Sequence, residues 1–427
     1  MGITGSNSTD EGLSVLQDID KKGSKYWATA CLHIGVLLLL FSAYNNRTIA
    51  LKYVAYGMSL ASLLVLAWRD PTYVKSKLRQ PTFKWLMLFL VVNAIAFFQL
   101  DREFQFTCAE EYRKGLFQAG LFATVVAIAI SDLKRLGHAI WALGLASLSV
   151  TISCLWEIRG STVDNVLLNA PTSVRDFSVR FIFYLPFVVI LFTQSKSWLR
   201  LLWAGLIVIQ LGLITFSGFR GGWLGLIVMI ALWIYYSKTK RKVIGVTSIC
   251  VLVVVFGWGA TSSGYVTGKL RQTDTSSRWE GTWRATLDMI KNKPVLGHGF
   301  CDVAFRAENA RLADTHPEWV LGKSLTDPHS IYLESAFAAG IPGMLILLCL
   351  FSSILRGVGH IAVVTNNSLL REYSVAVLCM FTSYFVVLGI FEPLQWEQLG
   401  IGVGLALTLG NISSSVDAMP KSGIDTT

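Results

Sequence analysis

Long apolar runs follow one another along almost the whole chain, each close to the roughly 20 residues that a helix needs to cross a bilayer. Backbone groups in lipid must be satisfied within the segment, and these runs lack the alternation of barrel strands, so each run is predicted to be a helix. Twelve such helices are predicted, at residues 26–44, 49–68, 84–100, 115–131, 137–156, 176–194, 198–217, 220–236, 242–260, 331–355, 372–391 and 397–415. The pattern indicates an all-α polytopic membrane protein.

Lysine and arginine are concentrated in alternate loops, which is the bias that orients membrane proteins. The loops on one side carry the basic residues Lys21, Lys22, Lys25, Arg69, Lys75, Lys77, Arg79, Lys134, Arg135, Lys196, Lys238, Lys240, Arg241, Lys242, Arg356 and Arg371. The opposite short loops are poorer in basic residues and mix them with acids. Both termini are therefore predicted in the cytoplasm, and the one long loop on the outer side.

Composition agrees with one continuous membrane domain, because 53% of the 427 residues are hydrophobic and only 15% are charged. The predicted layout is a cytoplasmic tail at 1–25, nine helices over 26–260, an outer loop at 261–330, three helices over 331–415 and a second tail at 416–427. The net charge of +10 reflects basic residues in short loops instead of a basic stripe, so it favours membrane orientation over nucleic-acid binding.

The seven cysteines are scattered, and no CxxC or Cys/His spacing predicts a metal site. Five of them lie within apolar runs. Cys108 and Cys301 fall in loops on the same predicted outer side, which leaves a disulfide between them open. Motifs for nucleotides, catalytic zinc or serine hydrolysis are also missing, so no cofactor is expected.

The outer loop is predicted to contain a helix that lies at the membrane interface. Ser277 and Glu280 match a capping box in front of a helix running to about Lys291. Apolar residues then recur at helical spacing, which predicts one interfacial face made of Trp279, Trp283, Leu287 and Ile290.

Three arginines are candidates for binding an anionic group. Arg220 stands before a glycine pair at the junction of two apolar runs, although a span-end arginine that snorkels to the headgroups has the same pattern. Arg278 and Arg284 lie on the predicted interfacial helix, and their guanidinium forks suit a pyrophosphate. Lipid headgroups are the alternative ligand, favoured for Arg284.

His329 is the candidate base, because Pro328 would begin a helix and place His329 in its first turn. The positive end of that helix would lower the pKa of the imidazole and keep it neutral. His298 and His316 are the competing histidines. Glu334, inside a span, and Glu392, in the last outer loop, are candidate supporting carboxylates, with Arg306 a further basic residue of the long loop.

The order of several motifs resembles the O-antigen ligase superfamily. The motifs are Arg-Gly-Gly-Trp-Leu at 220–224, Arg278 with Trp283, Lys-Pro-Val-Leu-Gly-His-Gly at 293–299, Pro-His-Ser-Ile-Tyr-Leu at 328–333, Ala-Gly-Ile-Pro-Gly at 339–343, Phe391-Glu392 and Gln-Leu-Gly-Ile-Gly at 398–402. The resemblance covers roughly residues 205–405. Phe219 and Ser330 depart from the serine and asparagine that the family often has there.

The resemblance implies an inverting glycosyltransferase that uses no metal and acts on the periplasmic face of the bacterial inner membrane. Such enzymes transfer polysaccharide from undecaprenyl pyrophosphate to a hydroxyl of lipid A-core. Carried over by motif, His329 would be the general base, and Arg220 and Arg278 would stabilise the pyrophosphate. An O-antigen polymerase or a protein O-oligosaccharyltransferase shares these motifs, and a flippase of lipid-linked sugars shares the helix number.

Overall fold

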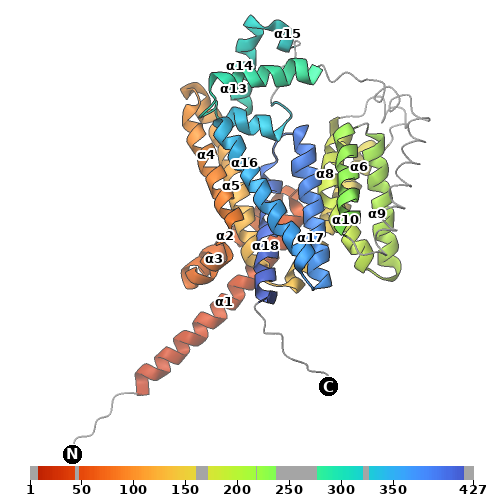
Figure 1. Cartoon of the computed structure of the whole chain (residues 1–427). Helices are drawn as coiled ribbons and strands as arrows, with labels where there is room; N and C mark the ends of the chain where they lie inside the picture. Colours follow the sequence, from red (N-terminus) through yellow and green to blue (C-terminus); the bar gives the residue numbers. More distant parts are fainter. Residues whose placement is uncertain are drawn as a thin grey trace, which may run out of the picture.

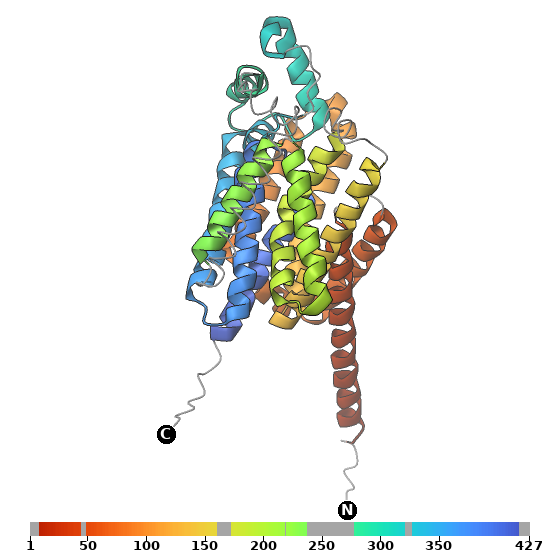
Figure 2. The same ribbon diagram turned by 90° about the vertical axis from the view of Figure 1, so that its right-hand side faces the viewer.

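The computed structural model describes residues 8–43, 48–159, 172–217, 219–236, 277–320 and 327–417, and within these ranges all regular structure is helical. Two orthogonal views show one upright bundle with short helices across one end (Figures 1 and 2). Nine of the described helices are long and apolar enough to cross a membrane. The prediction of an all-α polytopic membrane protein is confirmed at this level.

The helices of the bundle keep the order of the predicted spans. In the first half they are α1 (Ser8–Ser42), α2 (Ile49–Arg69), α3 (Pro71–Lys77), α4 (Pro81–Ala96), η2 (Phe97–Gln99), α5 (Arg102–Ala129), α6 (Leu133–Ile158), α8 (Thr172–Gln194), α9 (Ser197–Phe216) and α10 (Arg220–Tyr236). In the second half they are η3 (Ser277–Trp283), α13 (Arg284–Asn292), α14 (Asp302–Thr315), α15 (Pro317–Val320), α16 (Ile331–Val364), α17 (Ser368–Phe381), η4 (Thr382–Val387), η5 (Leu388–Ile390) and α18 (Trp396–Asp417).

Three of the twelve predicted spans are not among the nine described helices that are long and apolar enough to cross a membrane. The predicted span at 115–131 lies in α5, which is longer because it begins with a polar stretch at Arg102. The span at 220–236 forms α10, which is apolar but shorter than the others. The span at 242–260 lies outside the described residues.

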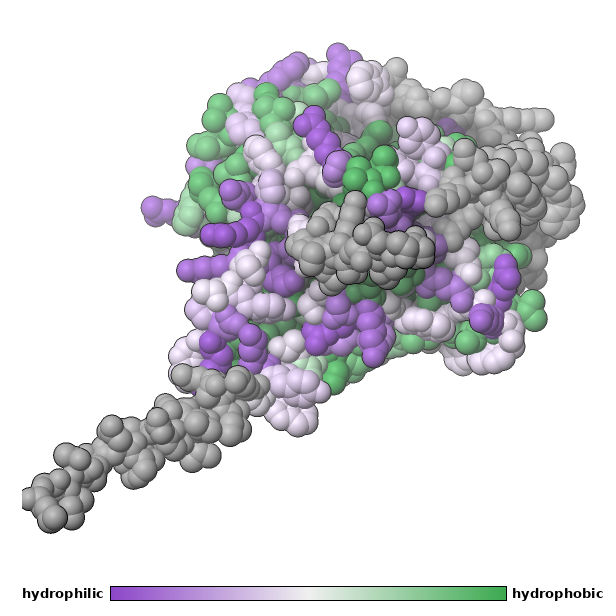
Figure 3. All heavy atoms as spheres, turned by 60° about the horizontal axis from the view of Figure 1, so that its bottom comes forward, coloured by the Kyte–Doolittle hydropathy of each residue, from purple (hydrophilic) through white to green (hydrophobic). Residues whose placement is uncertain are grey.

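The helices α13, α14 and α15 gather at one end of the bundle, which we call the loop end (Figure 1). The helix α1 begins and α18 ends at the opposite end (Figures 1 and 2). With that opposite end brought forward, hydrophilic side chains gather across the face (Figure 3). Exposed Lys75 lies in α3, exposed Arg79 follows α3, and exposed Lys134 lies at the start of α6.

The interfacial helix predicted over residues 277–291 is observed as η3 followed by α13, but its apolar side chains do not share one face. Trp279 and Leu287 are 62% and 39% exposed, whereas Ile290 is buried and Trp283 is half-buried. Ser277–Trp283 is a π-helix, whose wider turn shifts Trp279 relative to Trp283 from the register of an α-helix.

A break in α16 shapes the loop end. Ala339 and Gly340 leave the helical region, and Gly340 has a φ of 71° and a ψ of −177°. Pro342 carries no N–H, so the carbonyl of Ala338 loses the donor that an unbroken helix would supply. The first two turns of α16 are therefore separated from its long membrane-crossing part.

The segment 294–299 supplies the missing backbone partners. The N–H groups of His298 and Gly299 donate to the carbonyls of Phe337 and Ala338, at 2.8 and 2.9 Å. In return, the N–H of Ile341 donates to the carbonyl of Pro294 at 2.7 Å. We call these exchanged hydrogen bonds the interlock of 294–299 with 337–341. It joins two of the motifs on which the family resemblance rests.

Glycine is required at the centre of the interlock. A Cβ atom on Gly340 would collide with the carbonyl oxygen of Val295, and one on Gly297 would collide with that of Ala338. Both residues also have positive φ, at 71° and 67°. The close approach of the two backbones therefore depends on the absence of side chains at both positions.

We predict that Gly340→Ala lowers the stability of the protein by at least about 1–3 kcal/mol, because it combines a disfavoured backbone conformation with a steric clash. The measurement is the thermal unfolding midpoint in detergent, followed by tryptophan fluorescence. Gly357→Ala is the matched control in the same helix, since a Cβ there meets nothing within 4 Å. An equal midpoint for the two variants would contradict the role of the interlock.

Candidate functional site

A cavity of about 900 Å³ lies between the helices and the segments that connect them. Its walls come from α2, α5, α8, the segment before α14, the residue His329 and the segment that leads into α18. The lining residues are Ala43, Lys52, Glu111, Lys114, Gly115, Gln118, Asp176, Val179, Arg180, Phe300, Asp302, His329, Tyr384, Glu392, Pro393, Leu394, Gln395, Trp396, Glu397 and Gln398. A volume of this size fits several sugar rings or a pyrophosphate with its first sugars.

Three cations reach this cavity, and sequence reasoning missed all of them. Arg180 comes from α8, Lys52 from α2 and Lys114 from α5. Lys52 forms an ion pair with Glu397, and both side chains are largely buried. Lys114 pairs with Glu110 at 2.6 Å near the surface. The signal was available, because Arg180 and Lys52 stand inside predicted spans, where an ionisable residue is a functional candidate by default.

His329 lies on the cavity wall but not in the first turn of a helix, so that part of the prediction is wrong. The helix α16 begins at Ile331, with Ser330 as its N-cap. His329 precedes it with a φ of 49°, in the left-handed region that a helix cannot contain. Its N–H donates to Oδ1 of Asp327 at 2.6 Å, so the chain turns here before the helix starts.

The imidazole of His329 lies beside the same carboxylate. Nδ1 of His329 is buried and 2.9 Å from Oδ1 of Asp327, without hydrogen-bond geometry, and the histidine side chain is 35% exposed. A histidine that lies beside a carboxylate and lines a polar cavity is a candidate general base.

Arg220 is the first residue of α10, exposed, and does not line the cavity. The glycine pair that follows Arg220 leaves room for a side chain of the same protein, since a Cβ on Gly221 or Gly222 would come too close to the ring of Phe219. Gly221 also lies against Leu388 of η5, close to the segment that carries Glu392. The backbone of Arg278 is in η3, and its side chain falls outside the described part of the chain.

The remaining basic candidates do not line the cavity, although Arg306 is close enough to act on the charge of Asp302, which does. The guanidinium of Arg284 stands over the ring of Trp319, 4.7 Å from its centroid, and Arg306 is exposed on α14. Cation–π contact with Trp319 is the interaction that Arg284 makes in this structure.

The competing histidines have structural partners. His298 is buried, stacks on Phe337 at 4.9 Å and bonds through Nε2 to the carbonyl of Met289 at 2.8 Å. It therefore supports the interlock. His316 stacks on Trp319 at 3.8 Å, in the periphery formed by α14 and α15.

The two candidate glutamates have different surroundings. Glu392 lines the large cavity together with His329, and its backbone carbonyl accepts a hydrogen bond from the N–H of Ile331 at 3.0 Å. Glu334 instead accepts the N–H of Leu394 at 2.7 Å. It thereby fixes the segment between Glu392 and α18 against the start of α16.

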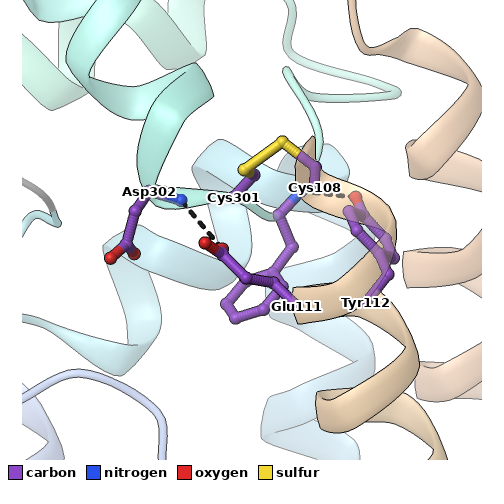
Figure 4. Close-up of a disulfide and its surroundings, with 6 residues drawn as sticks. Cys108, Glu111, Tyr112, Cys301 and Asp302 are labelled. Carbon is purple, nitrogen blue, oxygen red and sulfur yellow. Dashed lines mark hydrogen bonds between the residues drawn. A yellow bond between two sulfur atoms is a disulfide. The ribbon is translucent and has the colours of Figure 1, made fainter. Parts of the chain in front are cut away.

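A disulfide between Cys108 and Cys301 secures one wall of the cavity (Figure 4). Next to it, the N–H of Asp302 donates to Oε2 of Glu111 at 3.1 Å, and the N–H of Phe300 donates to the hydroxyl of Tyr112. The bond that the sequence left open is thus present, and it fixes Phe300 and Asp302 against α5.

The Asp302 carboxyl on this wall is influenced by its charged neighbours. Burial, and then the negative charge of Asp327, raise the pKa of the Asp302 carboxyl, while Arg306 opposes the shift.

Comparison with known proteins supports the resemblance seen in the motifs. Residues 205–348 match the family described as O-antigen ligase. The O-antigen ligase of Salmonella typhimurium strain LT2 is 29% identical over 251 residues, a match that covers 56% of this chain and 60% of that protein. The predicted family resemblance is confirmed over this region, and the match spans less than two thirds of the relative.

We predict that replacing both Cys108 and Cys301 by serine lowers stability by about 2–4 kcal/mol, the usual contribution of a disulfide. Thermal unfolding in detergent, with and without a reductant, measures the loss. Cys349→Ser is the control, since Cys349 is a free, exposed cysteine in α16. Equal midpoints for the double variant and the control would show that the bond does not hold the cavity wall.

Proposed function

Because residues 205–348 match the O-antigen ligase family, we propose that this protein is a membrane-embedded glycosyltransferase of that type. It transfers polysaccharide from undecaprenyl pyrophosphate to a hydroxyl of lipid A-core, with inversion at the anomeric carbon. The observation that carries the proposal is His329 on the wall of a cavity of about 900 Å³ that also holds Arg180 and two lysines. This cavity combines a base with a group of cations.

In the proposed reaction, Nε2 of His329 removes the proton of the acceptor hydroxyl as its oxygen attacks the anomeric carbon. The bond between that carbon and the phosphate oxygen breaks on the opposite face, so configuration inverts. The pyrophosphate leaves on the lipid carrier with the bonding electron pair. A general base typically contributes about 100- to 10,000-fold to such a step.

Positive side chains must meet the charge that develops on the pyrophosphate. The resemblance assigns this role to Arg220 and Arg278, and the cavity adds Arg180, a half-buried arginine on α8. A planar guanidinium binds two phosphate oxygens at once, and the ammonium of Lys52 cannot, which suits Arg180 better to this role. Fixed cations of this kind supply the charge stabilisation without a cofactor.

The other candidates have supporting roles in the proposal. Glu392 faces the acceptor within the cavity, and Glu334 keeps the 392–396 segment in place through its bond to Leu394. Arg284 and Arg306 lie outside the cavity, where they contact lipid headgroups or the glycan as it leaves.

The proposed location is the inner membrane of a bacterium, with twelve crossings, cytoplasmic termini and residues 261–330 in the periplasm. Two observations support this orientation. The helix α3, which carries the exposed Lys75, lies toward the end opposite α13–α15 (Figure 1). The Cys108–Cys301 disulfide is on the side of α14, and disulfides persist in the oxidising periplasm.

We expect the purified protein to transfer glycan from an undecaprenyl-pyrophosphate donor to lipid A-core, and His329→Ala to lose roughly 100- to 10,000-fold in kcat. Product is followed by gel shift in excess EDTA. His316→Ala, which changes an exposed histidine on the periphery, is the control. Parallel reactions offer a second lipid-linked glycan or an acceptor protein, and transfer to one of these alone would assign the protein to the polymerases or the protein glycosyltransferases.

We also expect Arg180→Ala to reduce kcat by about 100- to 1,000-fold, the loss seen when one preorganised charge-stabilising donor is removed. Arg180→Lys should recover only part of the rate, because an ammonium lacks the bidentate fork. Arg200→Ala is the control, since Arg200 is exposed and stacks on Phe192. Wild-type kcat in Arg180→Ala would remove Arg180 from the pyrophosphate site.

A further inference from the structure

The turn that carries His329 is restrained from several directions. Within the turn, Oδ1 of Asp327 accepts a hydrogen bond from the backbone N–H of His329 at 2.6 Å and lies 2.9 Å from Nδ1 of the same residue. From outside, the indole Nε1 of Trp283 donates to the carbonyl of Pro328 at 3.2 Å. A left-handed conformation at a residue other than glycine persists only where its surroundings enforce it, and these contacts provide that restraint.

Asp327 also favours one form of the imidazole. Nδ1 of His329 is buried and 2.9 Å from Oδ1 of Asp327, although the two atoms do not have hydrogen-bond geometry. A proton on Nδ1 avoids the repulsion between its lone pair and the carboxylate, and the lone pair of the ring then lies on Nε2. Once His329 has taken a proton, the carboxylate stabilises the resulting imidazolium.

Trp283 connects the turn to a third segment. Its ring stacks on Phe391 with the centroids 6.4 Å apart and the planes at 27°, and Phe391 immediately precedes Glu392. Trp283 is the last residue of the π-helical η3, and π-helical turns recur at functional sites because they redirect a side chain. Trp279, one helical turn earlier, is 62% exposed and packs edge-on against Trp283 with the ring centroids 6.2 Å apart, a contact that Trp279→Phe would keep.

We propose that Asp327 and Trp283 are positioning residues for His329, a refinement that rests on the proposed function. Asp327 favours the tautomer that leaves Nε2 able to accept the proton, because its carboxylate lies 2.9 Å from Nδ1. Trp283 holds the Pro328 carbonyl, and with it the turn, at a set distance from Phe391 and Glu392. Neither residue exchanges a proton with the substrates.

The test for Asp327 is the kinetics of Asp327→Asn in the purified full-length protein. Asparagine keeps an oxygen for the backbone N–H but removes the charge, so we expect kcat to fall about 10- to 100-fold while KM for donor and acceptor stays within about twofold. Asp314→Asn, an exposed residue of α14, is the control. A fall in folded yield with an unchanged kcat per folded molecule would overturn the positioning role of Asp327.

The test for Trp283 leaves Asp327 intact. In Trp283→Phe the ring can still stack on Phe391, but the hydrogen bond to Pro328 is lost, so we expect kcat to fall about 2- to 10-fold at unchanged KM. Trp279→Phe serves as the control. Wild-type kcat in Trp283→Phe or Asp327→Asn, beside an inactive His329→Ala, would overturn this inference alone. Full transfer by His329→Ala would instead overturn the proposed function.

Discussion

The backbone exchange between residues 294–299 and the break in α16 is the interaction on which the loop end depends. In an unbroken helix the carbonyls would accept hydrogen bonds from N–H groups of the same helix, and the N–H groups of the segment 294–299 would find no acceptor there. With the break, three hydrogen bonds join segments about forty residues apart in the sequence. The first turns of α16 can then bend away from the long span, which brings His329 to the cavity wall.

The charged and titratable residues that line the cavity come from both halves of the chain. Lys52, Arg180 and Lys114 come from three early helices, whereas His329, Glu392 and Glu397 come from the last quarter of the chain. A polar interior among apolar spans is costly unless its charges are balanced. The pair of Lys52 with Glu397 shows one such balance, across α2 and α18. The site is thus a property of the assembled bundle and of no single segment.

Much of the fold was readable from the sequence, because hydropathy depends only on local composition. Nine of the predicted spans are helices of the expected length and composition, and Cys108 is paired with Cys301, which the sequence predicts to lie on the same side. The position of His329 was read wrongly. Proline before a helix is a valid start signal, but Asp327 accepts the backbone N–H of His329, and the helix begins only at Ile331.

The different exposure of Trp279 and Trp283 was not predicted, because a π-helical turn has no recognisable periodicity in the sequence. Arg180 carried a signal in its own span, yet its place in the cavity depends on contacts between distant helices.

The disulfide has a consequence for how the molecule is assembled. It closes a covalent ring between residues 193 positions apart, and this ring contains α6, α8, α9 and α10. At a synthesis rate of about 5–20 residues per second, Cys301 is made roughly 10–40 seconds after Cys108. During that interval α5 lacks the wall formed by Phe300 and Asp302. This wall can therefore be fixed to α5 only after Cys301 has been made, and the residues from His329 to Gln398 that complete the cavity are made later still.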